Sequence, residues 1–154
     1  TDQEHEGALM QVADITTPNH RIGGVFRCAM PVRWGDLDAL GHVNNTVYFR
    51  YGEEARAKLF EQARMNLPAT RVGVLVHASC DFVKSLMYPA NISISLTLTR
   101  VGRSSMEFTF LIEDESGVAY ARGKNIIVCT DMDRGESAPW TADELERLTS
   151  CFSH

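Results

Sequence analysis

The segment "RWGDLDALGHVNN" (33–45) brings together residue types that can act on a carbonyl group. It holds two carboxylates, one imidazole and two side-chain amides, namely Asp36, Asp38, His42, Asn44 and Asn45. A carboxylate in such a loop can attack a thioester carbon directly, or it can activate a water molecule. If a helix begins at the asparagines, its first backbone amides lack intrahelical partners and carry about half a positive charge. Such an amide can hold a carbonyl oxygen that becomes negative during acyl transfer.

The same residues also have purely structural interpretations. We expect at least one of Asn44 and Asn45 to cap the helix, because an asparagine side chain can accept a bond from the first free amides. A loop aspartate such as Asp38 more often serves a turn, and an isolated histidine such as His42 more often makes structural hydrogen bonds. Asp36, Asp38 and His42 are conceivable metal ligands, but no further cluster in the sequence completes a metal site. No serine lies in a G-x-S-x-G motif, which argues against an α/β-hydrolase.

A strand and a long helix are predicted to flank this segment. Residues 25–33 alternate between apolar and other residues, as in a half-buried strand, and residues 34–44 are expected to form a loop. Over residues 46–64, apolar side chains recur at spacings of three and four, which places them on one face of a helix. Gly52 is a poor helix former, so its presence indicates close packing against a neighbour. Asn66 and Pro68 are expected to end the helix.

The remainder of the chain is predicted to form strands followed by a short helix. The expected strands cover residues 74–84, 92–99, 106–112 and 118–130. In strand 92–99 the apolar residues share one side, and the serines and threonines are expected to face solvent or a partner. Gly123 is a candidate β-bulge, and "TADE" (141–144) is a capping box that should start the short helix. This order predicts an α+β fold, with one antiparallel sheet and a helix on one face.

Composition places limits on the class of protein. The chain has 154 residues, 44% of them hydrophobic and 23% charged, which is ordinary for one soluble domain. Its net charge of -5 argues against nucleic acid as a partner, because phosphate binding requires clustered positive charge. No apolar run approaches the roughly 20 residues of a membrane helix, and we expect no signal peptide. The four cysteines form no C-x-x-C pair, so free thiols in a reducing cytoplasm are expected.

A family resemblance rests on motifs that stand in order along the chain. The stretch "VRWGDLDALGHVNNTVYFRYGEEAR" (32–56) resembles the opening of the hotdog-fold acyl-CoA thioesterases of the 4-hydroxybenzoyl-CoA thioesterase type. "DFVKSLMYPANISISLTLTRVGRSSMEFTFLI" (81–112) and "GVAYARGKNIIVCTD" (117–131) are similar to later strands of that family. The resemblance covers roughly residues 24–135. It leaves residues 1–23 as an expected mobile tail and residues 136–154 as a C-terminal segment with a short helix.

The resemblance implies a fold and an assembly. A long helix would be wrapped by a curved antiparallel sheet of about five strands. The family forms homodimers whose sheets join side by side, often assembled into tetramers, and pairing would remove an unprotected sheet edge. The active site would lie at the subunit boundary, near the start of the helix.

The resemblance also assigns roles to the opening segment. Asp38 matches the catalytic carboxylate, acting as nucleophile or general base, and the backbone amide of Asn45 matches the oxyanion donor. Gly41 would permit the tight turn between them. His42 and Asn44 match the G-H-V-N-N motif, where we expect orienting hydrogen bonds rather than proton transfer.

Further residues are expected to contact the substrate. Tyr48 matches an aromatic position that lines the pocket or packs beneath it. Coenzyme A carries phosphates, so the basic residues Arg100, Arg103 and Lys124 are candidates for binding them, with solvated surface charge as an equal alternative for each. Asn91 departs from the family pattern, in which an acidic residue often follows the Tyr-Pro turn.

The expected function is hydrolysis of an acyl-CoA thioester to a free acid and coenzyme A, without a metal or redox cofactor. One alternative is the same reaction on acyl carrier protein, which would favour a basic rim that the sequence lacks. Another is a non-catalytic acyl-CoA-binding protein, which would be expected to lack the carboxylate at Asp38. A ligand-responsive regulator would need a basic DNA-binding segment, and a hotdog dehydratase would need a different histidine motif. The acyl group is left open.

Overall fold

The structure is a computed structural model that describes residues 21–65 and 69–154, so the expected tail over residues 1–20 lies outside the described residues. The elements follow in the order β1 (Val25–Pro31), a 3-10 turn η2 (Trp34–Asp36), α2 (Asn45–Gln62), β2 (Arg71–Phe82), β3 (Asn91–Val101), β4 (Ser105–Asp114), β5 (Ala119–Asp131), β6 (Glu136–Ser137) and α3 (Ala142–Thr149). The predicted order of strand, helix, strands and helix is confirmed. The two-residue strand β6 and the 3-10 turn are additions to it.

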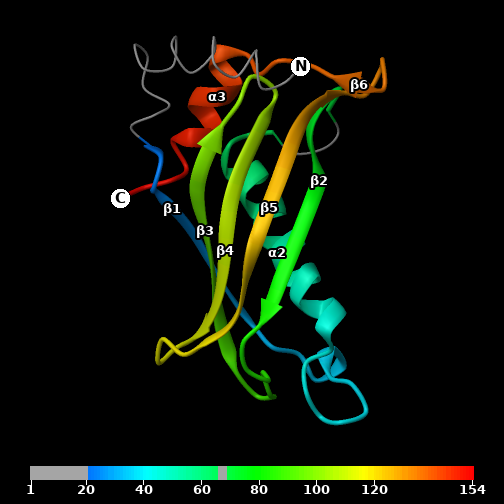
Figure 1. Cartoon of the computed structure of the whole chain (residues 1–154), viewed down its shortest axis with the longest axis vertical. Coiled ribbons are helices and arrows are strands. Elements are labelled where there is room, and N and C mark those ends of the chain that lie inside the picture. The colour runs from blue at the N-terminus through cyan, green and yellow to red at the C-terminus, as the bar shows by residue number, and fades with distance from the viewer. Residues whose placement is uncertain (1–20, 66–68) are drawn as a thin grey trace.

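The strands form one antiparallel sheet against which the long helix packs. Its order is β1-β3-β4-β5-β2, and the short β6 pairs with β5. Figure 1 shows the strands curving along the molecule, with α2 lying across one face of the sheet. The predicted α+β class is therefore confirmed. The order leaves β2 at one edge of the sheet, beside the start of α2.

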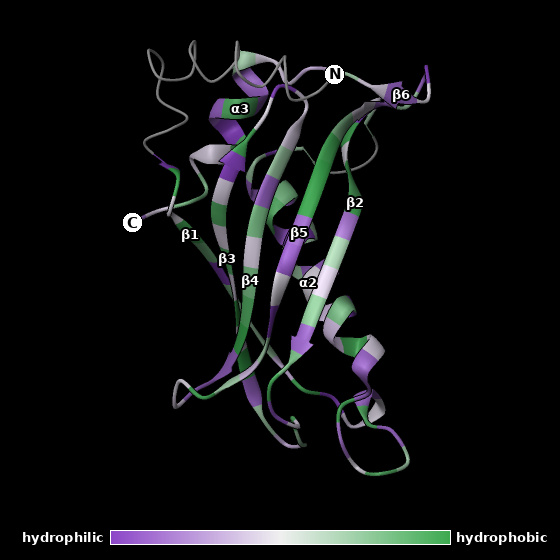
Figure 2. Ribbon diagram, in the orientation of Figure 1, coloured by the Kyte–Doolittle hydropathy of each residue, from purple (hydrophilic) through white to green (hydrophobic). Residues whose placement is uncertain are grey.

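Alternation along the central strands produces the core. In Figure 2, green segments alternate with pale ones along β3, as expected when successive side chains point to opposite faces. Ile92, Ile94, Leu96 and Leu98 of β3 are fully or almost fully buried toward the helix. The other face of β3 is less exposed than predicted, because Ser95 is buried there. The hydroxyl of Ser95 has no hydrogen-bond partner among the described residues.

The helix α2 begins one residue before the predicted start and ends two residues before the predicted end. Asn44 is the N-cap, and its side chain accepts a hydrogen bond from the N–H of Thr46. The helix ends at Gln62, close to Arg64, whose backbone is left-handed (φ 59°). The predicted end signals at residues 66–68 lie outside the described residues. The buried face of α2 contains the predicted apolar positions and, in addition, Arg56.

Gly123 is not a bulge, which corrects the prediction. It pairs in continuous register with Cys80 on β2 and with Phe110 on β4. A Cβ at this position would lie 1.8 Å from the carbonyl oxygen of Ser79, so a side chain has no space. The register shifts occur elsewhere, for example between Leu75 and His77 on β2. Glycine is therefore required here by close approach of the backbone, not by an extra residue.

The C-terminal segment is part of the same core. Thr141 and Glu144 form the predicted capping box at the start of α3. Leu148 and Phe152 are fully buried, and the ring of Phe152 packs against Phe108 of β4. Within residues 21–65 and 69–154, neither α2 nor α3 combines the length and apolar character that crossing a membrane would require.

Candidate functional site

The first aspartate of the opening segment fixes the loop to the helix. One carboxylate oxygen of Asp36 accepts hydrogen bonds from the Arg33 N–H (2.9 Å) and from the Tyr51 hydroxyl (2.7 Å). Burial, followed by the bond to Asp36, raises the pKa of Tyr51 well above its usual range, so this hydroxyl keeps its proton and donates. The carbonyl of Asp36 also accepts from the Asn44 N–H (2.9 Å). Asp36 therefore has the structural role that an isolated loop aspartate usually has.

The second aspartate is positioned differently. One carboxylate oxygen of Asp38 accepts from the backbone N–H groups of Leu40 (2.8 Å) and His42 (3.3 Å). The Gly41 N–H closes the turn on the Asp38 carbonyl (3.0 Å), and Gly41 has φ 80° as the predicted tight turn requires. The other carboxylate oxygen has no hydrogen-bond or ion-pair partner among the described residues. The half-buried Asp38 is thus oriented by its own loop and keeps one oxygen available.

The start of α2 provides a free backbone donor beside this carboxylate. The N-cap Asn44 binds the Thr46 N–H (3.0 Å) and the Thr46 hydroxyl (2.9 Å), which confirms that one asparagine is a cap. Asn45 is the first helical residue, and its N–H has no acceptor among the residues that the structure describes. An uncapped N–H at this end of an 18-residue helix carries part of the positive end of the helix dipole.

A cavity of about 320 Å³ joins the predicted residues. Its lining comes from the loop, the start of α2 and the end of β2: Asp38, Leu40, His42, Val43, Asn45, Tyr48, Phe82, Val83, Lys84 and Ser85. The structure therefore brings Asp38, Asn45, His42 and Tyr48 to one hollow. Gly41 and Asn44 shape the loop and the cap beside it, and they do not line the hollow.

Two lining residues act through packing and backbone bonds. His42 contributes its backbone to the Asp38 turn, since its carbonyl accepts the Asp38 N–H (2.8 Å), while its ring has no recorded bond to Asp38. Tyr48 is buried, and its hydroxyl accepts the Leu86 N–H (3.2 Å). Burial raises the pKa of Tyr48, so the phenol stays neutral. Its ring packs edge-on against Phe82, which also lines the cavity.

Sequence reasoning missed Lys84 and Ser85. Both lie within three residues of the end of β2 and line the cavity, and the Lys84 ammonium lies 5.9 Å from the centre of the Tyr120 ring. The motif "DFVKS" contains them, yet only the sheet order shows that the end of β2 lies beside the start of α2. A lysine at a strand end is recognisable in a sequence, but its neighbour on another element is not.

The predicted phosphate-binding residues do not gather around this cavity in a single chain. Arg100 and Arg103 lie at the β3–β4 turn, where the Arg103 carbonyl accepts the Trp140 N–H (2.9 Å) close to α3. Figure 1 shows that this turn is at the opposite end of the sheet from the loop before α2. Lys124 lies in the middle of β5 and forms a 3.7 Å ion pair with Glu107. Contact of these three residues with coenzyme A stays a prediction.

A larger and mainly apolar cavity, of about 510 Å³, lies at the other end of α2, between Phe60, Met65, Val72 and Met132. None of the candidate catalytic residues lines it. The smaller cavity is therefore the better candidate site of the two, because it combines a carboxylate with a free helix amide.

The structure gives little support for a cysteine nucleophile or for a metal site in its described residues. All four cysteines are free, as predicted, and burial raises the pKa of both Cys80 and Cys129 to about 11, so their thiols stay protonated near neutral pH. Among the described parts of the chain, no group of three or more histidine, cysteine, aspartate or glutamate side chains could hold a metal ion.

The fold and the site define a hotdog-fold protein with a loop carboxylate opposite a helix tip. The family model of the "Thioesterase-like superfamily" matches residues 32–148, and the chain belongs to this family. The chain is 32% identical to a putative thioesterase of Pseudomonas aeruginosa, PA2801, over 75% of this chain and 92% of that one, with a TM-score of 0.73.

The chain is also similar to two further proteins. The uncharacterized protein YsmA of Bacillus subtilis is 29% identical over 76% of this chain and 80% of its own length. The 1,4-dihydroxy-2-naphthoyl-CoA thioesterase of Synechocystis, Slr0204, has a TM-score of 0.73 at 22% identity, over 81% of this chain and 96% of that one. At that identity, the likeness to Slr0204 concerns the fold alone.

Proposed function

We propose that this protein hydrolyses an acyl-CoA thioester to a free carboxylic acid and coenzyme A. The observation that carries the proposal is the cavity lined by both Asp38 and Asn45, with one free carboxylate oxygen and one free helix amide. A thioester bound there would have its carbonyl oxygen near the amide and its carbon accessible to the carboxylate. Membership of the thioesterase-like superfamily supports the same reaction.

Either of two steps would follow from this geometry. As a general base, Asp38 would remove a proton from a water molecule whose oxygen attacks the thioester carbon. As a nucleophile, Asp38 would form an anhydride with the acyl group, which water would then cleave. In both routes the carbonyl oxygen becomes negative, the Asn45 N–H stabilises it, and the C–S bond breaks to release the thiolate. Water is the only co-reactant, so the proposal involves no metal or redox cofactor.

Lys84 is the residue that we assign to the coenzyme A side of the cavity. It is exposed, follows β2 and lies beside the hydrophobic wall formed by Phe82 and Val83. An ammonium at the mouth of the cavity would attract a phosphate, although the whole chain is acidic. Lys84→Ala is expected to raise KM for acyl-CoA with little effect on kcat.

We further infer that two copies pair along β2. Six consecutive residues of this edge strand, 74–79, are exposed although their side chains alternate between the two faces of the sheet. Val76 is 59% exposed at the register shift, and Figure 2 shows green segments along this edge. Exposed apolar edge strands invite pairing with another strand. Antiparallel pairing would place the start of one β2 beside the end of the other, where Phe82 and Val83 line the cavity.

The second copy would thus complete each site. Val76→Lys, which places a charge on the edge, is expected to give monomers in analytical ultracentrifugation and to reduce turnover. A dimer that persists in this variant would contradict pairing along β2. Assembly into a tetramer and a cytoplasmic location, which the free thiols favour, are parts of the same proposal.

The test of the proposed function is a hydrolysis screen with the full chain. Release of the coenzyme A thiol would be followed over aromatic, short, branched and long acyl-CoA substrates, with Asp38→Asn as the control. We expect release from at least one substrate, well above that of the variant. If the acid were released only from thioesters of acyl carrier protein, the substrate would carry that protein in place of coenzyme A. If no thioester were hydrolysed faster than by the variant, the proposal would be contradicted.

A further inference from the structure

The strand β2 lines a different hollow at each of its ends. Near its start, Val72 and Gly73 line the apolar cavity of about 510 Å³ at the end of α2, and its last residue, Phe82, lines the candidate site. From Gly73 to Phe82 a strand advances about 30 Å, at roughly 3.3 Å per residue. Within one chain, the apolar cavity therefore lies far from the carboxylate of Asp38 and the amide of Asn45.

The strand is also symmetric about its own middle. Its bounds, Arg71–Phe82, and its exposed stretch, 74–79, share one centre, between Val76 and His77. The side chains on the side of the sheet that carries α2 are arranged evenly about the same centre, because the register shift beside Val76 changes the alternation there. They are Arg71, Gly73, Leu75, Ala78, Cys80 and Phe82.

This symmetry defines the register in which two copies would pair along β2. Antiparallel pairing places side chains of the same face opposite one another, so Gly73 of one copy would lie opposite Cys80 of the other, about 5 Å away. The wall of one apolar cavity would then lie beside Phe82 at the site of the other copy. A two-fold axis perpendicular to the sheet keeps both α2 helices on one side of it. The apolar cavity of each copy would thus face the candidate site of the other across the seam between them.

The apolar cavity has the size, lining and access that an acyl chain requires. Its volume lies within the range of small-molecule pockets, and the described residues that line it, such as Phe60 and Val72, are uncharged. Its rim is open, since Ala57 is exposed and Met132 is 55% exposed. On the other side of the seam Phe82 is 45% exposed, so the wall of the site is accessible as well.

We propose that each apolar cavity holds the far end of the acyl chain that is bound at the site of the other copy, so that the substrate is the coenzyme A thioester of a long, uncharged acyl chain. The inference rests on the proposed function and on pairing along β2, and it names the substrate class for the same site. The thioester carbonyl lies at Asn45 of one copy. The chain passes Phe82, crosses the seam and enters the cavity of the partner subunit, whose rim is formed by Ala57 and Met132.

The first test needs no variant. Hydrolysis of dodecanoyl-CoA and butanoyl-CoA by the full chain would be compared below the concentrations at which they form micelles. We expect kcat/KM to be at least about 10-fold higher for dodecanoyl-CoA, because burial of each further methylene group is worth roughly fourfold. An equal or higher value for butanoyl-CoA would overturn the inference and leave the proposed function intact.

A second test fills the cavity. Ala57→Phe introduces a ring at the exposed rim, where the core is not disturbed, and should lower the dodecanoyl-to-butanoyl ratio by roughly 10-fold. Lys58→Phe introduces the same ring at the next exposed position of α2, which borders the groove beside β1, and should leave the ratio unchanged. Equal ratios for the two variants would show that the cavity does not hold the chain.

A mixed dimer tests which copy supplies the cavity. One copy carries Asp38→Asn and the other Ala57→Phe, and the two are co-expressed with different tags and purified together. The copy that retains Asp38 then finds an open cavity only across the seam. Hydrolysis of dodecanoyl-CoA should reach about half of the wild-type rate, because one of the two symmetric sites is complete.

The mixed dimer also separates this inference from the proposed function. If it kept the low dodecanoyl-to-butanoyl ratio of Ala57→Phe, the chain would not cross the seam, and the inference would be overturned while hydrolysis of butanoyl-CoA upheld the proposed function. If the wild-type protein hydrolysed no acyl-CoA at all, both would fail together.

Discussion

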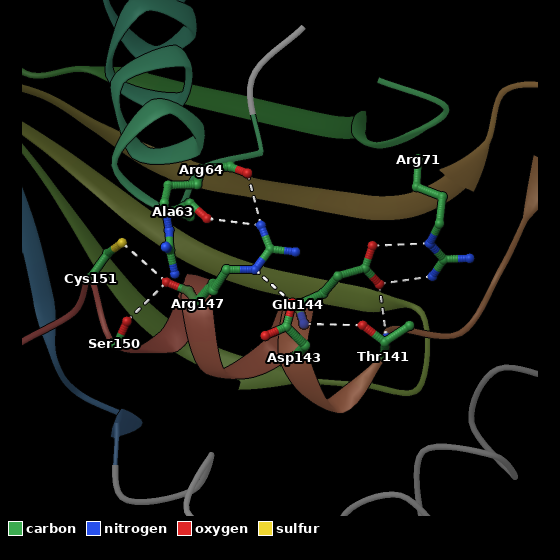
Figure 3. A network of polar contacts seen from close by, with 9 residues as sticks. All are labelled: Ala63, Arg64, Arg71, Thr141, Asp143, Glu144, Arg147, Ser150 and Cys151. Atoms are coloured by element: carbon green, nitrogen blue, oxygen red, sulfur yellow. Dashed lines mark hydrogen bonds and ion pairs between the residues drawn. The ribbon is translucent and has the colours of Figure 1, made fainter. Parts of the chain in front are cut away.

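The two ends of the molecule use their polar side chains in different ways. At the α3 end, Arg71 at the start of β2 makes two hydrogen bonds to Glu144, of 2.9 and 2.8 Å, and Glu144 also accepts the Thr141 N–H (2.8 Å). Arg147 donates to the Ala63 and Arg64 carbonyls at the end of α2. Figure 3 shows these contacts joining α3 to two other parts of the chain. This end is a network of long-range bonds that fixes the fold.

At the opposite end, around residues 33–45, the polar groups are satisfied mainly within their own loop. Asp38 binds amides two and four residues away. The loop is joined to later parts of the chain by the Tyr51–Asp36 bond and by the bond from the Val43 N–H to the Leu86 carbonyl (2.8 Å). The loop also exposes large apolar side chains, Trp34 at 76% and Leu40 at 78%. Unlike the α3 end, this end keeps a carboxylate oxygen, a helix amide and an apolar surface available for a ligand. Substitutions at the two ends should therefore have separable effects.

The largest effect is expected from Asp38→Asn. Loss of the general base or nucleophile should lower kcat by about 10²- to 10⁴-fold, while the thermal midpoint changes little because the amide oxygen can still accept both loop bonds. Asp36→Asn is the matched control in the same loop. It should lower the midpoint through the weakened Tyr51 bond and have a smaller effect on kcat. Equal turnover by Asp38→Asn and the wild type would remove Asp38 from the mechanism.

Asn45→Pro should have the next largest effect. Proline removes the backbone N–H, and turnover is expected to fall by about 10²- to 10³-fold if this amide is the oxyanion donor. The first helical position tolerates proline, and the preceding Asn44 already has the extended backbone (φ -62°, ψ 137°) that proline requires. Asn45→Ala keeps the amide and serves as the control. Steady-state kinetics that fall equally for both variants would show that the side chain, not the N–H, is what matters.

Glu144→Gln should affect stability and not catalysis. It removes the charge from the Arg71 pair and weakens the capping box, and we expect the free energy of unfolding to fall by about 1–3 kcal/mol. Urea unfolding followed by circular dichroism would measure it. Thiol release at a temperature where the variant is folded should match the wild type. A loss of turnover in the folded variant would break the proposed separation of the two ends.

The smallest effect concerns the pH dependence of stability. The hydrogen bonds from Arg71 and the backbone lower the pKa of Glu144 below its ordinary value of 4.5. Because the folded state favours the ionised form, this contribution is fully present above about pH 4.5 and is lost as the pH falls through the folded-state pKa. The unfolding free energy of the wild type should therefore fall more steeply below pH 4.5 than that of Glu144→Gln. Parallel curves would contradict the pairing with Arg71.

The parts of the fold that follow local patterns could be predicted from the sequence. The apolar face of α2, the alternation of β3 and β4 and the capping box at Thr141 are all encoded within single elements. Gly123 was assigned wrongly, because a glycine that avoids a neighbouring strand has the same sequence signature as one that forms a bulge. Its requirement arises from Ser79, which is 44 residues away and pairs with the next position.

The candidate site divides in the same way. Asp38, Asn45 and Tyr48 could be located because one motif carries them all, whereas Lys84 owes its place to the sheet order. Outside the site, Arg56 belongs to a helix segment rich in charged residues. Only the structure reveals that its guanidinium lies toward the sheet.

The most direct test of the central claim is a crystal structure with a thioether-linked, non-hydrolysable acyl-CoA analogue that keeps the carbonyl group. The carbonyl oxygen is expected within hydrogen-bond distance of the Asn45 nitrogen, at about 2.9 Å. The free oxygen of Asp38 should face the carbonyl carbon, directly or through one water. An analogue bound with its carbonyl away from the tip of α2, for example in the apolar cavity at the other end of the helix, would contradict the account.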